Sequence, residues 1–153
     1  MSKAEFYYKD KNAPKPNKPN HIGVSVIIEY NNKILLEHRT DSETWAVIGG
    51  GLKIDETLIQ CAIRETKEET GIKLANHKLT FCNIYDDPSR IASYSDDGIK
   101  RIITVVYKVT LEQEPNLICS KESRELKFFS KDELKNITIA KTHIPIIEDY
   151  IYD

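Results

Sequence analysis

The chain is poor in the residues and patterns that mark secreted, membrane-bound or metal-stapled proteins. Its three cysteines are odd in number and widely spaced, so neither a disulfide framework nor a zinc-knuckle spacing is present. No apolar run approaches the length of a membrane span, and the first residues lack the apolar stretch of a signal peptide. We therefore expect free thiols, a cytoplasmic location and no membrane partner.

An excess of charge of one sign is also missing. The sequence has 22 Lys and Arg against 24 Asp and Glu, which gives a formal net charge of -2. This balance excludes a protein that binds polyanions through bulk charge, although a local basic patch stays open. Nucleic acid is therefore not an expected partner.

What is present is the composition of one globular domain. Hydrophobic residues make up 40% and charged residues 30% of the 153 positions, which argues against extended disorder. Pro14, Pro16 and Pro19 stand among lysines and asparagines and favour an extended backbone. We expect an extended arm over residues 1–20 and a single domain over residues 21–153.

Apolar and β-branched runs predict strands around one central helix. The expected strands cover residues 22–29, 33–38, 45–48, 79–85, 101–110 and 126–129, and the expected helices cover residues 58–70 and 142–152. A polar loop is expected over residues 86–100. Strands mixed with two substantial helices indicate an α+β fold with a mixed sheet covered on both faces.

Capping signals define the helix ends. Thr57 and Gln60 form a capping box before the central helix, and Gly71 follows it where a left-handed C-cap residue is wanted. Ser130 and Glu133 fit a second capping box, which predicts a further short helix.

Three glutamates share one side of the central helix. Glu65, Glu68 and Glu69 are spaced i, i+3 and i+4, where like charges repel and destabilise a helix. A solvated acidic face is the simpler explanation, but only Arg64 stands four residues from one of these acids, and Lys67 points to another side. Converging oxygen ligands suit Mg²⁺, which keeps several waters and accepts substrate phosphates. We therefore expect a divalent-cation site.

A glycine run before this helix supports the same interpretation. Gly49, Gly50 and Gly51 let the backbone approach a ligand closely and offer carbonyl or amide groups where a side chain would block them. We expect Gly50 to contact the substrate. A turn alone would explain the glycines, but acids and glycines together favour a site.

The segment that holds these residues resembles the Nudix box, GX5EX7REUXEEXGU with U a bulky aliphatic residue. It reads Gly50-x5-Glu56-x7-Arg64-Glu65-Thr66-Lys67-Glu68-Glu69-Thr70-Gly71-Ile72. Thr66 departs from the pattern, where an aliphatic residue is usual. Upstream, the segment Trp45-Ala46-Val47-Ile48-Gly49-Gly50 resembles W-x-x-P-G-G, with Ile48 in place of proline. Further landmarks extend the resemblance over residues 22–152.

The resemblance implies an α/β/α sandwich with a mixed β-sheet and a site for Mg²⁺, with Mn²⁺ as a substitute. The implied metal ligands are Glu65, Glu68, Glu69 and the carbonyl of Gly49. Glu65 would also orient or deprotonate the attacking water, and Glu56 with Arg64 would form a supporting pair between loop and helix. Clustered Mg²⁺ ions neutralise pyrophosphate oxygens and lower the pKa of a bound water.

Many members of the family add an acid from a late loop. Glu122 and Glu125 precede Leu126-Lys127-Phe128-Phe129, which resembles the late pattern E-x-x-E-x-x-W-F. We favour Glu122 as a further catalytic acid because its distance to Phe128 fits a loop acid better. That both are surface glutamates beside basic neighbours is equally well supported.

Substrate contacts are less well defined by the sequence. Arg39 ends the second strand, where family members often place a basic residue near the substrate phosphate, but it is one of 22 basic residues. Arg90 lies in the loop expected to shape the leaving-group pocket. Candidates for stacking on a base are Trp45, Tyr85 and Tyr94, although aromatic residues in a small domain are more often core. Four histidines have no metal-ligand spacing, and we interpret them as incidental: His21, His38, His77 and His143.

We expect a metal-dependent pyrophosphohydrolase that cleaves a nucleoside diphosphate linked to another moiety, either ADP-ribose-like or a modified nucleoside triphosphate, by attack of water on phosphorus. One alternative is a Nudix-fold binding or sensor module without catalysis, which the complete set of acids disfavours. Another is an RNA-end processing enzyme. The expected partner is a small nucleotide. The oligomeric state is not readable, and a homodimer stays open.

Overall fold

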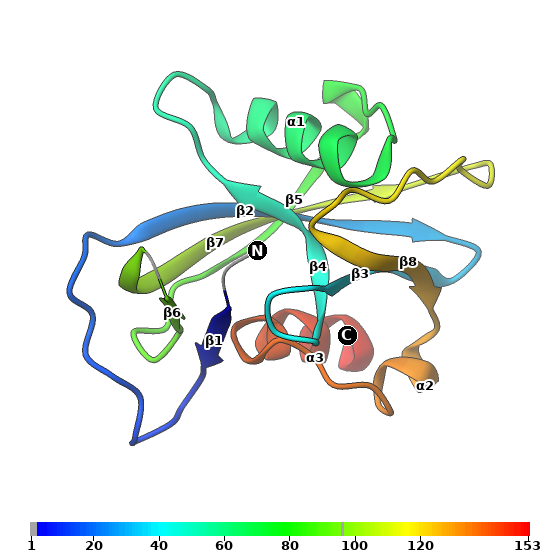
Figure 1. Cartoon of the computed structure of the whole chain (residues 1–153). Coiled ribbons are helices and arrows are strands. Elements are labelled where there is room, and N and C mark those ends of the chain that lie inside the picture. The colour runs from blue at the N-terminus through cyan, green and yellow to red at the C-terminus, as the bar shows by residue number, and fades with distance from the viewer. Residues whose placement is uncertain (1–2, 96) are drawn as a thin grey trace.

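The computed structural model describes residues 3–95 and 97–153 of the chain. An eight-stranded mixed sheet forms its centre, with α1 over one face and α2 and α3 under the other (Figure 1). This arrangement confirms the expected α/β/α sandwich. The strands are β1 (Ala4–Tyr7), β2 (His21–Tyr30), β3 (Lys33–Arg39), β4 (Trp45–Gly51), β5 (Thr80–Tyr85), β6 (Ile91–Tyr94), β7 (Gly98–Thr110) and β8 (Ser123–Phe129). The helices are α1 (Leu58–Thr70), α2 (Lys131–Leu134) and α3 (Ile144–Tyr152), with short 3₁₀ turns η1 (Asn76–Lys78) and η2 (Lys141–His143).

The sheet is ordered β1-β6-β7-β2-β4-β3-β8, and β5 pairs with β7 as well. Strands β2 and β7 run parallel over nine residue pairs, whereas the other pairings are antiparallel. The predicted hairpin between β2 and β3 is confirmed. Its turn places Asn31 and Asn32 at φ 54° and 60°, a left-handed conformation that asparagine tolerates and that tight hairpins require.

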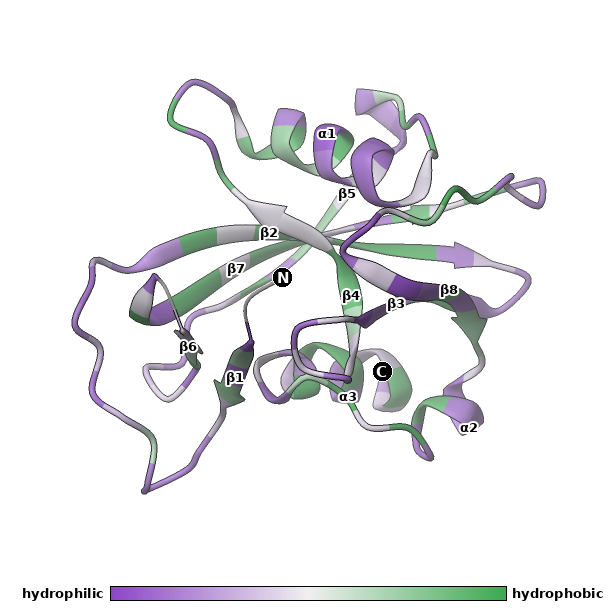
Figure 2. Cartoon of the chain, in the orientation of Figure 1, coloured by the Kyte–Doolittle hydropathy of each residue, from purple (hydrophilic) through white to green (hydrophobic). Residues whose placement is uncertain are grey.

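Alternation along the central strands divides the core into two clusters. Val24, Val26 and Ile28 of β2 pack toward α1 with Cys61 and Ala62, and none of these side chains is more than 1% exposed. A second cluster packs β3, β4 and β7 against α2 and α3. In Figure 2 the strands of the centre and α3 are the most hydrophobic stretches, while the connecting loops are largely hydrophilic.

The predicted helix ends are confirmed at α1. The Thr57 side chain accepts a hydrogen bond from the Gln60 amide at 3.1 Å, and the Gln60 side chain accepts one from the Thr57 amide at 2.8 Å. Gly71 ends the helix at φ 79°. The capping box of Ser130 and Glu133 opens α2 as predicted.

Two expectations about the edge of the sheet are wrong. The first twenty residues are not simply an extended arm, because Ala4–Tyr7 forms β1 and buries Ala4. The loop expected over residues 86–100 contains β6, which pairs antiparallel with β1 and β7. Each of these strands has four residues, too few for an apolar pattern, and their pairing joins segments far apart in the sequence. Residues 8–20 are irregular between β1 and β2.

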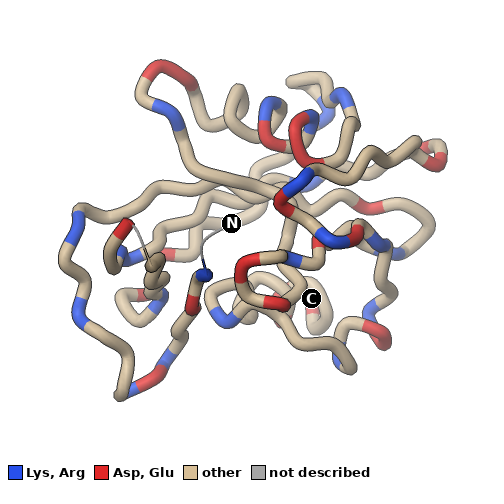
Figure 3. The backbone as a smooth tube through the Cα atoms, in the orientation of Figure 1, with Lys and Arg blue, Asp and Glu red and all other residues tan. Residues whose placement is uncertain are grey.

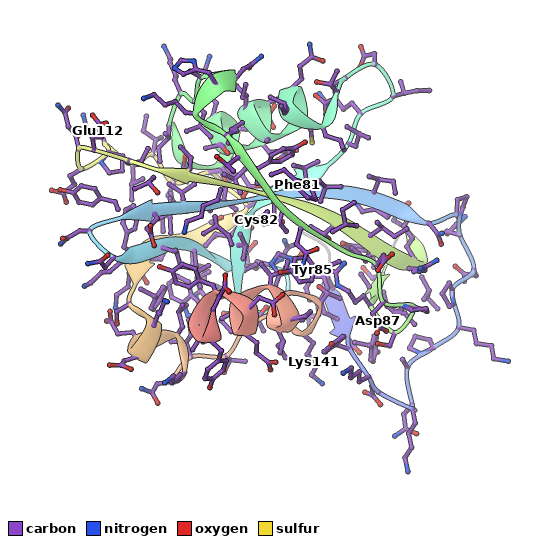
Figure 4. The ribbon with its side chains drawn as sticks, turned by 180° about the vertical axis from the view of Figure 1, so that it is seen from behind. Phe81, Cys82, Tyr85, Asp87, Glu112 and Lys141 are labelled. Carbon is purple, nitrogen blue, oxygen red and sulfur yellow. The ribbon has the colours of Figure 1, made fainter. Side chains whose placement is uncertain are left out.

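Strand β5 crosses the back of the molecule, with Phe81, Cys82 and Tyr85 along it (Figure 4). Tyr85 reaches α3, where its hydroxyl donates to Asp149 at 2.7 Å. Among residues 3–95 and 97–153, no helix has the length and apolarity to cross a bilayer.

Candidate active site

A cavity of about 300 Å³ opens at the carboxyl end of β4. Six of the residues expected to form the site line it: Arg39, Gly49, Gly50, Glu65, Glu69 and Glu122. Two of these acids come from α1, the glycines from β4, and Glu122 from the loop before β8. Because Arg39 comes from β3, the fold brings together four segments of the chain.

Close packing requires two of the glycines, Gly50 against the acidic helix and Gly49 against β2. A Cβ atom on Gly50 would lie 2.2 Å from the carboxyl carbon of Glu65, and one on Gly49 would lie 2.1 Å from the carbonyl oxygen of Val24. Such distances are far below any van der Waals contact. The backbone of β4 therefore lies directly against the Glu65 carboxylate, an approach that only glycine permits.

Glu69 is buried at the cavity, and its carboxyl group is only partly satisfied by hydrogen bonds. Its side chain is 7% exposed, and its Oε2 atom has no hydrogen-bond partner among the described residues. Burial raises the pKa of Glu69, and the neighbouring carboxylates of Glu37 and Glu65 raise it further. A buried carboxyl group with an unpaired oxygen is costly unless a proton or a cation compensates it.

Glu37 is a member of this cluster that the sequence analysis missed. It lies on β3, is 4% exposed, and accepts a hydrogen bond from the Ser123 hydroxyl at 2.8 Å. The available signal was its place at the end of the apolar run Ile34-Leu35-Leu36 in a strand whose inward positions are otherwise hydrophobic. A charged residue at such a position needs a partner.

These donors fit a divalent cation. Glu37, Glu65 and Glu69 offer only hard oxygen atoms, the type that Mg²⁺ and Mn²⁺ prefer. As the side chains stand, no group of three or more His, Cys, Asp and Glu among the described residues forms a ready coordination shell. Mg²⁺ suits such a partial site because it keeps several waters.

Arg64 joins this helix to the loop before it. Its guanidinium donates to Glu56 at 2.7 and 2.9 Å, to Glu65 at 2.7 Å and to the carbonyl of Gly51 at 3.1 Å. The pair with Arg64 lowers the pKa of Glu56 to about 2. Arg64 therefore ties Glu65 both to the loop and to the backbone of β4.

The other acids predicted from the sequence do not all line the cavity. Glu68 is 54% exposed, lies 3.1 Å from Arg64 and is not among the residues that line the cavity. Glu122 lines the cavity, and its carbonyl accepts hydrogen bonds from the amide and hydroxyl of Thr40. Glu125 is exposed in β8, opposite His38. The geometry therefore favours Glu122 over Glu125.

The two arginines expected to bind substrate have different environments. Arg39 lines the cavity, but Asp41 binds it in a bidentate pair at 2.8 and 2.5 Å. Arg90 is fully buried, and its guanidinium donates to the carbonyls of Tyr85, Ile102 and Thr142 and to the hydroxyl of Thr104. The expectation that Arg90 binds substrate is wrong, because every donor is used inside the protein.

Aromatic residues complete the cavity wall. Phe6 of β1 and Tyr94 of β6 meet edge to face with ring centroids 6.4 Å apart, and both line the cavity. No sequence signal pointed to Phe6, because it lies in the segment expected to be an arm. Trp45, a stacking candidate, instead packs against His38 and Phe129 with centroids 4.8 Å away.

Comparison with known proteins identifies the family. A family model described as the NUDIX domain covers residues 19–150. An ADP-ribose pyrophosphatase from Methanocaldococcus jannaschii is 30% identical over 133 residues, which span 85% of this chain and 72% of that protein. An NAD-capped RNA hydrolase from Vibrio atlanticus is 46% identical, but over 55 residues that make up 20% of its length.

Solved structures agree. A bifunctional NMN adenylyltransferase/ADP ribose pyrophosphatase from Francisella tularensis is 30% identical with a TM-score of 0.72, over 91% of this chain and 42% of that one. A structure of the same kind of protein with AMP and a manganese ion gives 28% identity and a TM-score of 0.67. The chain therefore spans less than half of these bacterial proteins. With a family match over nearly its whole length, the chain belongs to the Nudix family and is a hydrolase of diphosphate bonds.

Proposed function

We propose that the chain is a Mg²⁺- or Mn²⁺-dependent pyrophosphohydrolase that cleaves ADP-ribose, or a related nucleoside diphosphate linked to another moiety, by attack of water on phosphorus. The observation that carries this proposal is the buried carboxyl group of Glu69, whose Oε2 atom lacks a hydrogen-bond partner at the glycine edge of the cavity, with the acids Glu37 and Glu65 beside it. The archaeal and bacterial relatives named as ADP-ribose pyrophosphatases support the choice of substrate.

The acids and glycines of the cavity have distinct roles in this proposal. A bound divalent ion would neutralise the diphosphate oxygens and lower the pKa of a water molecule. Glu65, held by Arg64 and packed on Gly50, is positioned to orient that water and to take its proton. Glu69 supplies buried negative charge for the ion at the edge of the cavity formed by Gly49. Glu37 does not line the cavity itself and adds negative charge beside Glu69.

The aromatic wall of the cavity suits the organic part of the substrate. Phe6 and Tyr94 offer aromatic surface for a base or a sugar. Arg39 stands near the acids, but Asp41 and Glu37 already neutralise its charge. We therefore propose that Arg39 positions Glu37 and Asp41 and also contacts the phosphates of the substrate. A cytoplasmic location and a small nucleotide as partner are part of the same proposal.

The test is a hydrolysis screen over a nucleotide panel with Mg²⁺, Mn²⁺ or a chelator, with identification of the products. We expect ADP-ribose to yield AMP and ribose 5-phosphate only when the metal is present. Glu65→Gln keeps the volume of the side chain and should lower turnover about a hundredfold or more. Glu125→Gln, outside the cavity, is the matched control and should stay near wild type, whereas Glu122→Gln should be slower.

The opposite result has a clear meaning. If the wild type binds ADP-ribose but hydrolyses no nucleotide at any concentration of divalent metal, the chain is a binding module and the proposal is wrong. Equal turnover of the wild type and Glu65→Gln would remove this acid from the mechanism.

A further inference from the structure

His143 holds an unusual place between the sheet and the layer of α3. It ends the 3₁₀ turn η2, and its Nδ1 atom lies 3.0 Å from the backbone amide of Val47 in β4. An amide N–H only donates, so Nδ1 accepts this bond and carries no proton. The ring proton of a neutral imidazole then resides on Nε2.

The surroundings keep this ring neutral. Burial, together with the charges of Arg90 and Arg39, lowers the pKa of His143 to about 3. An imidazolium would place a proton on Nδ1 and break the bond from Val47, which would leave a backbone amide of a central strand unpaired. The tautomer is therefore set by the main chain of β4.

The free side of the ring faces the cavity. His143 is one of the residues that line it. No hydrogen bond among the described residues uses Nε2, and this atom is not among the buried side-chain atoms that lack a partner. The ring therefore presents an N–H donor to whatever occupies the cavity.

The donor and the carboxylates belong to opposite layers. Glu65 and Glu69 reach the cavity from α1, whereas Val47, to which His143 is bound, packs in the cluster on the side of α3. A ligand whose diphosphate lies at the carboxylates would place its organic part toward His143 and the aromatic pair of Phe6 and Tyr94.

We propose that His143 is a specificity-determining residue that donates its Nε2–H to an uncharged oxygen or nitrogen acceptor on the nucleoside or sugar part of the substrate. This inference rests on the proposed function. A neutral ring discriminates by hydrogen-bond geometry rather than by charge, and a site built to bond such a group rejects analogues that lack it.

Two substitutions separate this role from a structural one. In His143→Asn the amide oxygen replaces Nδ1 as acceptor for Val47, but nothing remains at the Nε2 position. In His143→Gln the longer amide reaches the Nε2 position as a donor, while the Val47 amide loses its partner. His77→Asn, at an exposed histidine in η1, is the matched control.

The readouts are the melting temperature and the KM and kcat for ADP-ribose. For His143→Asn we expect a melting temperature near wild type, a KM about tenfold higher and little change in kcat, as loss of one hydrogen bond predicts. For His143→Gln we expect a lower melting temperature with a KM closer to wild type. A purely structural histidine predicts instead that His143→Asn is like wild type in every readout, including the KM.

A second measurement needs no ligand. Nitrogen-15 NMR of the imidazole ring should show an unprotonated Nδ1 and a protonated Nε2 in the free protein from pH 5 to 8. A proton on Nδ1 would overturn the inference. If the wild type hydrolyses ADP-ribose and His143→Asn has the same KM, the proposed contact of His143 is wrong but the proposed function stands. If the wild type is inactive, both the proposed function and the contact are wrong.

Discussion

Two buried charged residues, Arg90 and Glu69, differ in how their polar atoms are satisfied. Arg90 uses all its donors on main-chain and hydroxyl oxygens. Glu69 leaves an oxygen unpaired beside other acids. A saturated charge is structural, whereas an unsaturated one is available to a ligand.

The Glu69→Gln variant tests the unsaturated acid. Because the pKa of Glu69 is raised in the folded state, the folded protein binds a proton that the unfolded chain releases above pH 4.5, and this lowers the stability of the wild type as the pH rises. Without metal, Glu69→Gln should therefore melt higher than wild type at pH 8 and about equally at pH 4.

Metal addition completes this experiment. Millimolar Mg²⁺ should raise the melting temperature of the wild type by mass action and should have little effect on Glu69→Gln. Glu68→Gln is the control, because Glu68 is exposed and should keep most of the shift. Equal metal-induced shifts in all three proteins would contradict the assignment of the site.

Arg90→Met tests the saturated charge. Methionine keeps most of the volume but leaves the carbonyls of Tyr85, Ile102 and Thr142 without their donor, which should cost about 3 kcal/mol or more. At a temperature where the variant is folded, its KM for ADP-ribose should equal that of wild type. A normal melting temperature with a raised KM would restore Arg90 as a substrate-binding residue.

At the scale of elements, α1 and the loop before it act as one unit. Capping bonds set where the helix starts, and Arg64 ties Glu56 in the loop to Glu65 in the helix. The position of Glu65 thus depends on a contact between two neighbouring elements. The like-charge repulsion expected between Glu65 and Glu68 is offset because the same guanidinium lies against both.

Arg64→Lys should break this unit. A lysine ammonium is a compact point charge and cannot match the planar fork that bonds Glu56, Glu65 and the carbonyl of Gly51 together. We expect a loss of about 2 kcal/mol in unfolding free energy by denaturant titration and a fall in kcat. Lys67→Gln, at an exposed position of the same helix, should change neither.

At the scale of the whole molecule, His143 joins the layer of α3 to the centre of the sheet. Its pKa is lowered from 6.5 to about 3, so between these values the unfolded chain binds a proton that the folded protein does not. Stability should therefore be full above pH 6.5 and fall as the pH drops toward 3.

Denaturant titrations at several pH values check this expectation. All other titratable groups are the same in both proteins. The difference in unfolding free energy between wild type and His143→Asn at each pH therefore reports on the histidine. We expect the variant to lose less stability between pH 6.5 and 3. Parallel pH dependences would show that the ring is already charged in the folded state.

The free edge of β5 is the other feature of the whole molecule. Among the described residues, β5 pairs with β7 alone, and its six residues carry no charge. A bulge at Cys82 sets Phe81 opposite Tyr107 and Ile84 opposite Val105, so both apolar side chains lie on the α1 face at 56% and 48% exposure. Figure 3 shows charges of both signs interspersed elsewhere along the chain. An uncharged apolar edge is prone to pair with another strand.

We expect the wild type to self-associate through this edge at high concentration. Ile84→Lys places a charge there and should shift light-scattering mass toward the monomer while turnover per subunit stays unchanged. Thr110→Lys, at the exposed end of β7, is the matched control. The same mass distribution in all three proteins would show that the edge is not used.

Signals confined to a few neighbouring residues were enough to predict the hairpin, the bounds of α1 and the acids of the box. Asn31 and Asn32, Thr57 with Gln60, and Gly71 act through bonds to residues within four positions, so the chain specifies them without its tertiary context. The resemblance of Gly50–Ile72 to a known motif added the family, which the match over residues 19–150 shows.

Burial and long-range contact were decided by the tertiary structure alone. Arg90 and Arg39 look alike in the sequence, yet one is sealed by carbonyls from three segments and the other lines the cavity. Glu37 joins Glu69, Phe6 joins Tyr94, and His143 joins Val47 across separations that no local pattern spans. The cost of burying a charge or an N–H depends on which atoms surround it, and only the folded chain brings those atoms together.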